Sequence, residues 1–241
     1  DQEMSRGLGD VYKRQGVSGE SLSLTGAGIL GAASAGTQTI TNNNTLAIAD
    51  GTGSASNYTL NGASINVTVI PKTLNVTLAR EYDGTTTVAG ALLTPTFDSL
   101  QGGETLAISG TGSVVNANVG SSKAVTLGTI ALAAGSGNPS NYSLNSVLLD
   151  VTQRVINLDG IRAYDATTNV LSSDINTFGN IVSGETLTIS GTGSVATNSV
   201  EMNKAISLGT LSLGNGSGAA GNYTLAGGTH TFDISPVAVN I

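Results

Sequence analysis

The stretch GETLAISGTGS at residues 103–113 returns almost unchanged as GETLTISGTGS at residues 184–194. Within it, the apolar residues Leu106 and Ile108 are separated by a small residue, and a Gly-Thr-Gly turn sequence follows. A period of two is typical of strands that bury one face, and Gly-rich segments indicate turns. The stretch therefore predicts a short strand and a tight turn that the chain uses more than once.

Other segments repeat at the same spacing. SNYTL at residues 56–60 returns as SNYSL at 140–144 and as GNYTL at 221–225, and YDGTT at 82–86 returns as YDATT at 164–168. Offsets of 81 to 84 residues between these copies indicate tandem modules of about 82 residues. We place a truncated first module at 16–70 and complete modules at 71–152 and 153–235. Residues 236–241 would form the first strand of a fourth module.

Each complete module contains six to seven short alternating segments separated by Gly-rich turns, and helical spacing is missing. We predict an all-β chain whose modules are small antiparallel sandwiches of immunoglobulin-like kind. A β-grasp-like sheet is the alternative. In the first strand of the second module, the alternation predicts that Leu74, Val76 and Leu78 point inward.

The final strand of one module runs into the first strand of the next without a flexible spacer, as in VIPKT at residues 69–73. Proline fixes φ and disfavours helix in the residue before it, so Pro71 and Pro236 should stiffen an extended crossing. A strand of about eight residues is about 27 Å long, so we predict a rod on the order of 70 to 100 Å in length.

The first fifteen residues differ in kind from the rest, because six of them are charged in a chain with 10% charged residues overall. Residues 1–15 resemble the translated read-through of a sequencing adapter found in assembled environmental DNA. We expect this segment to be a disordered artefact outside the fold. A mobile natural N-terminus is the alternative.

Composition excludes several classes of function. With no cysteine and one histidine, the chain offers no thiolate zinc site, cysteine nucleophile or multi-histidine metal site. A net charge of −7, with only nine Lys and Arg, gives no basic surface for nucleic acid. No apolar run approaches the roughly 20 residues of a membrane helix, so we expect no membrane insertion.

Two recurring polar groups are the candidate structural motifs. The first contains the Tyr-Asp pairs and the glycine that follows one of them, which could form a turn after the first strand or a polar contact surface. The second contains the Asn-Tyr pairs, which we interpret as a turn followed by an inward tyrosine. Together these residues are Tyr82, Asp83, Gly84, Tyr164, Asp165, Asn57, Tyr58, Asn141, Tyr142, Asn222 and Tyr223.

These segments resemble the YDG domain of bacterial surface proteins, and the resemblance covers residues 16–241. Tandem YDG domains occur in large filamentous-haemagglutinin-like adhesins, so the resemblance implies secretion and an extracellular or cell-surface location. Two departures limit it. Ala166 stands where the signature glycine would be, and the first module lacks the Tyr-Asp-Gly segment. Shared function therefore cannot depend on Gly84.

The remaining candidates for chemistry are weak. His230 aligns with the apolar strand positions Ile65 and Val147 and has no Ser or Asp pattern around it, so we interpret it as a strand-end histidine. Glutamates recur at 20, 104 and 185, each alone in a turn, which does not support a paired-acid glycosidase. Calcium between modules is a rival hypothesis, but the chain has no clustered acidic loop.

We therefore expect no enzymatic activity, no cofactor and no metal. The predicted function is that of structural stalk repeats in a secreted bacterial adhesin, in which serial modules project a distal binding region. Their partners would be the neighbouring modules of the same chain. In the alternative, the modules themselves bind a host glycan or protein through the Gly/Asn-rich loops.

Overall fold

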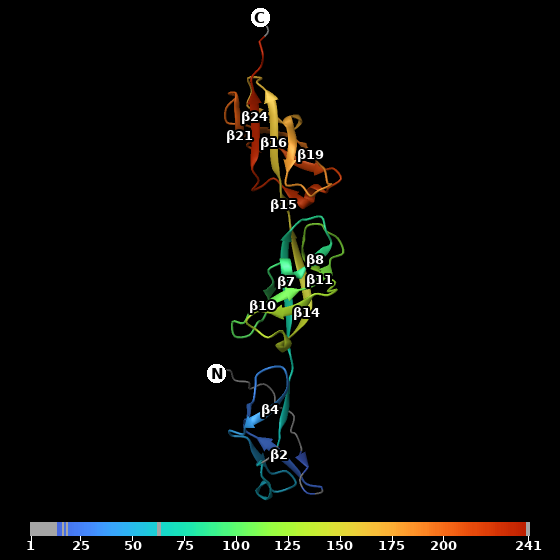
Figure 1. The fold of residues 1–241 in the computed structure, drawn as a ribbon, viewed down its shortest axis with the longest axis vertical. Helices are drawn as coiled ribbons and strands as arrows, with labels where there is room; N and C mark the ends of the chain where they lie inside the picture. Colours follow the sequence, from blue (N-terminus) through green and yellow to red (C-terminus); the bar gives the residue numbers. More distant parts are fainter. Residues whose placement is uncertain (1–13, 16, 18, 62–63, 240–241) are drawn as a thin grey trace. The chain divides into compact units, whose positions relative to one another are not determined.

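The computed structural model describes residues 14–15, 17, 19–61 and 64–239. The chain divides into two compact units: unit 1 contains residues 1–73 and 137–143, and unit 2 contains residues 74–136 and 144–241. Strands and short 3-10 turns make up the secondary structure, and the described residues contain no α-helix. The prediction of an all-β chain is confirmed (Figure 1).

Unit 1 contains two antiparallel sheets, with strand orders β1-β2-β5 and β3-β4-β6. Its elements are β1 (Arg14–Gln15), β2 (Ser21–Thr25), β3 (Ile29–Leu30), β4 (Gly36–Asn42), β5 (Ala47–Ala49), η1 (Ala55–Asn57) and β6 (Asn66–Val69). The pairing of β1 with β2 differs from our expectation that residues 1–15 lie outside the fold, because Arg14 and Gln15 pair with Leu22 and Ser21. Backbone groups pair in this way whatever the side chains are. Residues 1–13 lie outside the described part of the chain.

The second module has a four-stranded sheet of order β12-β14-β7-β9 and two antiparallel two-stranded sheets, β10-β13 and β8-β11. The N-terminal ends of β7 and β14, together with η3, are assigned to unit 1. The elements are β7 (Lys72–Glu81), β8 (Thr87–Ala89), η2 (Gly90–Leu92), β9 (Thr96–Phe97), β10 (Leu106–Ser109), β11 (Thr111–Ser113), β12 (Gly120–Ala124), β13 (Ala131–Ala134), η3 (Pro139–Asn141) and β14 (Tyr142–Thr152).

The third module repeats this arrangement, with a sheet of order β18-β16-β24-β21 and the pairs β19-β22, β17-β20 and β15-β23. Its elements are β15 (Arg154–Val155), β16 (Asn157–Ala163), β17 (Asn169–Leu171), η4 (Ser172–Asp174), β18 (Ile175–Gly179), β19 (Leu187–Ser190), β20 (Thr192–Ser194), β21 (Glu201–Ala205), β22 (Ser212–Asn215), η5 (Ala220–Asn222), β23 (Tyr223–Thr224) and β24 (His230–Ser235).

The central pair of this sheet is parallel. β16 and β24 lie side by side (Figure 1), with Leu158 opposite His230 and Ala163 opposite Ser235. β15 also pairs with β23 in parallel. The expectation of purely antiparallel sheets is therefore wrong at these pairs, because alternation along a strand carries no information about direction. Since first and last strands run the same way, the chain enters the third module at one end of its sheet and leaves at the other, about 20 Å away.

Alternation does predict which side chains are buried. Leu74, Val76 and Leu78 on β7 are at most 1% exposed, as expected from the period of two. The first module shows what the central strand contributes. Val67 is 36% exposed, whereas its equivalents in the complete modules, Leu149 and Phe232, are fully buried. In those modules β14 and β24 lie between two strands, and β6 has β4 as its one partner in the described sheet.

The buried apolar residues of the second and third modules form one connected cluster, which runs from Val76 to Ile234 and includes Tyr82 and Tyr223. The core is therefore continuous across the junction of the two modules. This continuity arises because aromatic side chains occupy the junction. The linkage is also short: a single residue, Gln153, separates β14 from β15.

The recurring Gly-Thr-Gly segments turn tightly between two strands. Gly110 has φ +78°, and a Cβ there would lie 2.0 Å from the carbonyl oxygen of Thr129. Gly191 is equivalent, with φ +94° and 2.1 Å to the oxygen of Thr210. Both conformation and space therefore require glycine at this position of the module.

Candidate functional site: the junction of the second and third modules

The Tyr-Asp-Gly segment forms a turn at the end of β7. Asp83 Oδ1 accepts hydrogen bonds from the Thr85 amide at 2.9 Å and from the Thr85 hydroxyl at 3.0 Å. The Arg80 guanidinium also holds the turn, because it pairs with Asp83 at 2.9 Å and donates to the Thr87 carbonyl at 2.6 Å. We did not predict Arg80 from the sequence. Its signal is the recurrence of arginine three residues before the aspartate.

The third module repeats the turn with the same contacts. Arg162 pairs with Asp165 at 3.0 Å, and Asp165 accepts the Thr167 amide at 2.9 Å. The bond from Thr167 lowers the pKa of Asp165. Ala166 has φ +62°, so this alanine adopts the left-handed conformation that Gly84 has at +74°. The turn thus forms without glycine, as the departure at residue 166 suggested.

The two tyrosines at the junction share one carboxylate. Tyr82 donates to Glu185 Oε1 at 2.6 Å, and Tyr223 donates to Glu185 Oε2 at 2.6 Å. Their rings meet edge to face with centroids 5.4 Å apart. Tyr82 is 5% exposed and Tyr223 2% exposed. We call this group, Tyr82, Glu185 and Tyr223, the tyrosine–glutamate clamp.

The clamp raises the pKa of both phenols. Burial is the main cause for Tyr223, followed by the hydrogen bond to Glu185, and together they raise its pKa to about 12. The same two causes raise the pKa of Tyr82. Both groups therefore stay neutral at physiological pH and act as hydrogen-bond donors to a carboxylate. The arrangement provides a charged anchor point between β7 and the third module.

A buried asparagine makes a second link beside the clamp. Asn222 is 4% exposed, its Oδ1 accepts from the Val119 amide at 3.0 Å, and its Nδ2 donates to Asn118 Oδ1 at 3.0 Å. Unit 1 contains the equivalent contact, in which Asn141 accepts from the Ala35 amide at 2.9 Å. Equivalent asparagines of two modules thus accept a hydrogen bond from equivalent backbone amides.

Arg154 and Gln153 hold the linker itself. Arg154 donates to the Asn180 carbonyl at 2.6 Å and to the Asn180 side chain at 2.7 Å, and it reaches the Tyr82 carbonyl at 3.4 Å. The amide of Gln153 donates to the carbonyls of Gly221 and Tyr223. These bonds fix the residues that pass from one module to the next.

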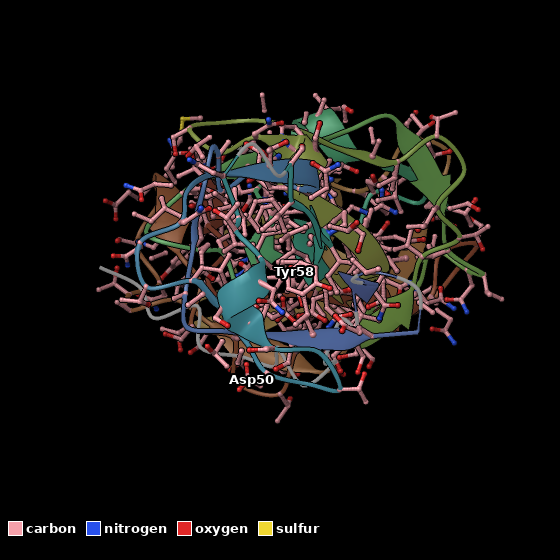
Figure 2. The ribbon with its side chains drawn as sticks, turned by 90° about the horizontal axis from the view of Figure 1, so that it is seen from below. Asp50 and Tyr58 are labelled. Atoms are coloured by element: carbon pink, nitrogen blue, oxygen red, sulfur yellow. The ribbon has the colours of Figure 1, made fainter. Side chains whose placement is uncertain are left out.

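Unit 1 contains one half of a clamp. Tyr58 donates to Glu20, and the Tyr58 hydroxyl accepts from the Val17 amide at 2.9 Å. The hydrogen bond to Glu20 raises the pKa of Tyr58. Figure 2 labels Tyr58 next to the turn η1, whose first amide, that of Ala55, donates to Asp50 at 2.6 Å. Tyr58 is half-buried and the preceding Asn57 is exposed, in contrast to Tyr223 and Asn222.

The candidate residues therefore have different environments. A buried tyrosine after the turn is found at Tyr142 and Tyr223, whereas Tyr58 is half-buried. The two Tyr-Asp pairs differ in exposure: Tyr82 is buried in the clamp, and Tyr164 is 42% exposed. Glu185, which we had considered only as a catalytic acid and rejected, joins the Tyr-Asp segment to the Asn-Tyr segment through its bonds to Tyr82 and Tyr223.

His230 has both ring nitrogens bonded to backbone. Its Nδ1 accepts from the Leu158 amide at 3.1 Å, and its Nε2 lies 2.9 Å from the Leu225 carbonyl, to which it donates. These two contacts place the donating N–H on Nε2. The ring links β16 to the segment before β24, which agrees with its interpretation as a strand-end histidine.

Other features of the described residues offer little for chemistry. They contain no group of three or more His, Cys, Asp or Glu that could hold a metal ion. No helix in the described part of the chain is long and apolar enough to cross a membrane. Two shallow hollows occur at equivalent positions, one of about 370 Å³ lined by Leu46, Tyr58 and Leu60, and one of about 460 Å³ lined by Leu211, Tyr223 and Leu225.

The fold and the junction define a tandem all-β repeat protein whose second and third modules are joined through buried side chains. A family model for the YDG domain matches the chain twice, at residues 70–148 and 152–231. The two matches together cover well over half of the chain, so the chain belongs to the YDG domain family. Comparison with curated proteins gives no match, and comparison with solved structures gives none either.

Proposed function

We propose that these modules are the structural stalk of a secreted bacterial surface adhesin of the filamentous-haemagglutinin-like kind, and that they project a distal binding region from the cell. The observation that carries this proposal is the parallel pairing of β16 with β24, because a module whose chain leaves at the end opposite its entry adds length when it is repeated. The proposal places the chain outside the cell and assigns it no enzymatic activity.

The junction supports a spacer role. A stalk transmits its direction only if successive modules keep a fixed relation. Flexible linkers between domains allow relative motion by default. Here one residue, Gln153, separates the strands of adjacent modules, and the clamp and Asn222 are buried beside it. These contacts oppose rotation about the linker, which a passive but stiff spacer requires.

We further propose that each complete module is a β-grasp-like unit rather than an immunoglobulin-like sandwich. In the third module the first and last strands are the central, parallel pair, and each has an antiparallel neighbour, β18 for β16 and β21 for β24. An immunoglobulin-like sandwich pairs its strands in two antiparallel sheets. The mixed sheet therefore favours the β-grasp-like alternative.

A second candidate function is the binding of a host glycan or protein through the Gly/Asn-rich loops. The hollow at Leu211–Leu213 and residues 220–226 adjoins the loop at 214–222, and the hollow in the first module occupies the equivalent place. Ligand sites in such surfaces use exposed aromatic side chains, and Tyr223, which lines the hollow, is 2% exposed. We therefore rank this function second.

Small-angle X-ray scattering on the whole chain tests the spacer function. We expect a maximum dimension on the order of 70 to 100 Å and a cross-section of one module. A curve that fits a compact sphere of this mass would contradict the proposal.

A glycan array tests the alternative with the same protein. The stalk proposal expects no binding above the level of a variant in which Asn215 and Asn222 are replaced by serine. Binding that this variant loses would favour direct recognition by the modules. Asn222 also contributes to the junction. Asn215→Ser alone therefore serves as the control, because it changes the loop and leaves the junction intact.

A further inference from the structure

We propose that the surface around Tyr164 at the exit end of the third module is a docking site for a further YDG-type module, which would supply the glutamate and tyrosine of a second clamp. This inference concerns the chemistry that joins modules, and it holds whether or not the array serves as a spacer. The occupant is identified by its side chains: a carboxylate already bound by one tyrosine, with a buried asparagine nearby.

The first argument is the difference between equivalent residues. Tyr82 and Tyr164 each lie between a strand and an aspartate turn that an arginine holds by an ion pair. However, Tyr82 is 5% exposed and Tyr164 is 42% exposed. The Tyr82 hydroxyl donates to Glu185 of the following module. The Tyr164 hydroxyl has no hydrogen-bond partner among the described residues, although its backbone amide bonds to Ser235. Tyr164 is thus placed like Tyr82 and lacks the carboxylate.

The second argument comes from the neighbouring backbone. Val119, whose amide donates to Asn222, is half-buried, whereas the equivalent Val200 is 49% exposed. The segment after β24 shows the same change: Val239 is 84% exposed, and its equivalents Leu74 and Ile156 are fully buried. Tyr164, Val200 and Val239 are thus exposed at positions whose equivalents the complete junction covers.

The third argument is that the other half of the clamp recurs at the entry end of modules. Glu185 with Tyr223 and Glu20 with Tyr58 are bonded pairs at the same separation of 38 residues. Glu104 and Tyr142 have this separation in the second module. An entry-end pair thus also forms in unit 1, where no second tyrosine among the described residues bonds to Glu20, so a bonded pair is available to receive a tyrosine from another module.

Ala166 limits how closely the occupant can approach. A Cβ at Gly84 would lie 2.9 Å from Val182 Cγ1 of the third module. Ala166 has this Cβ, so an occupant with valine at that position must rotate the side chain. We therefore expect the tightest docking when residue 166 is glycine or when the incoming side chain is smaller than valine.

A chain extended by one module tests the proposal. Residues 1–235 are followed by a second copy of residues 153–241 that carries Tyr164→Phe, so that the one remaining Tyr164 meets a copy of Glu185 and Tyr223 in the register of the existing junction. Acetylation of tyrosine by N-acetylimidazole is followed by peptide mass spectrometry in the native and extended chains. We expect Tyr164 to react roughly tenfold more slowly in the extended chain, while the rate at Tyr82 stays the same.

Two variants make the result specific. Glu185→Gln in the added copy keeps the shape and removes the charge, so it should restore much of the reactivity of Tyr164. Ala166→Gly should increase the protection. Equal reactivity of Tyr164 in the native and extended chains would overturn the proposal. An added copy that stays unfolded would also overturn it, because the same sequence folds when it follows the Tyr82 surface.

Discussion

Loss of the Tyr82 hydroxyl should destabilise the junction, and the third module contains a matched control for it. Tyr82→Phe removes one O–H group that donates to Glu185 at 2.6 Å and leaves the bond from Tyr223 in place. Hydrogen bonds to charged groups contribute about 1.5–3 kcal/mol, and because Glu185 keeps one donor we expect a loss of about 1.5–2 kcal/mol. Tyr164→Phe changes a half-exposed side chain and should cost less than about 0.5 kcal/mol.

Native-state hydrogen exchange, read by mass spectrometry on peptides of the second and third modules, measures this loss where it occurs. Hydrogen exchange also assigns the loss to a particular module, which a global free energy of unfolding does not, because cooperativity between repeats can break down. A double-mutant cycle with Glu185→Gln should give a coupling of about 1 kcal/mol or more with Tyr82→Phe and none with Tyr164→Phe. The same loss in both tyrosine variants, or no loss in either, would refute the reasoning.

Three further outcomes are expected. The pKa of Tyr223 is raised from 10.0 to about 12, so the stability that its neutral phenol contributes is fully present below pH 10 and is lost as the pH rises toward 12. Urea unfolding in an alkaline series should show a loss of at most about 2–3 kcal/mol from this group, and Tyr223→Phe should remove that part while the loss from Tyr82, whose pKa is also raised, remains. Gly110→Ala should cost about 2 kcal/mol or more in thermal unfolding, because its Cβ would meet Thr129, whereas Gly102→Ala, with φ +57° and open space, should cost about 1 kcal/mol; equal costs would contradict the steric account. Arg80→Lys should cost about 1–3 kcal/mol in urea unfolding, since lysine cannot bridge the carbonyls and the carboxylate of the turn. Unchanged stability would show that the turn forms without the guanidinium.

Repetition and alternation in the sequence predict much of the fold. The inward positions of β7, the turn after β10 and the direct passage from β14 to β15 all follow from the local pattern. Strand direction does not, because a period of two is the same in parallel and antiparallel pairs. The mixed sheet could therefore be recognised only once β16 and β24 were seen side by side.

The clamp was missed for a different reason. Its members Tyr82 and Glu185 are 103 residues apart and lie in different modules, so no local pattern links them. The sequence does contain a signal for the other bond. Glutamate and tyrosine keep a separation of 38 residues in all three modules, although the module offsets vary from 81 to 84. A constant separation of two polar residues inside repeats of variable length indicates a contact, and we had considered each residue alone.

Scattering from the native chain and from the chain extended by one module tests the serial arrangement most directly. If modules add end to end, the maximum dimension should increase by about 27 Å or more, the length of a strand of about eight residues, at constant cross-section. An unchanged maximum dimension with a thicker cross-section would show that modules pack side by side, and the account of this chain as a stalk would be contradicted.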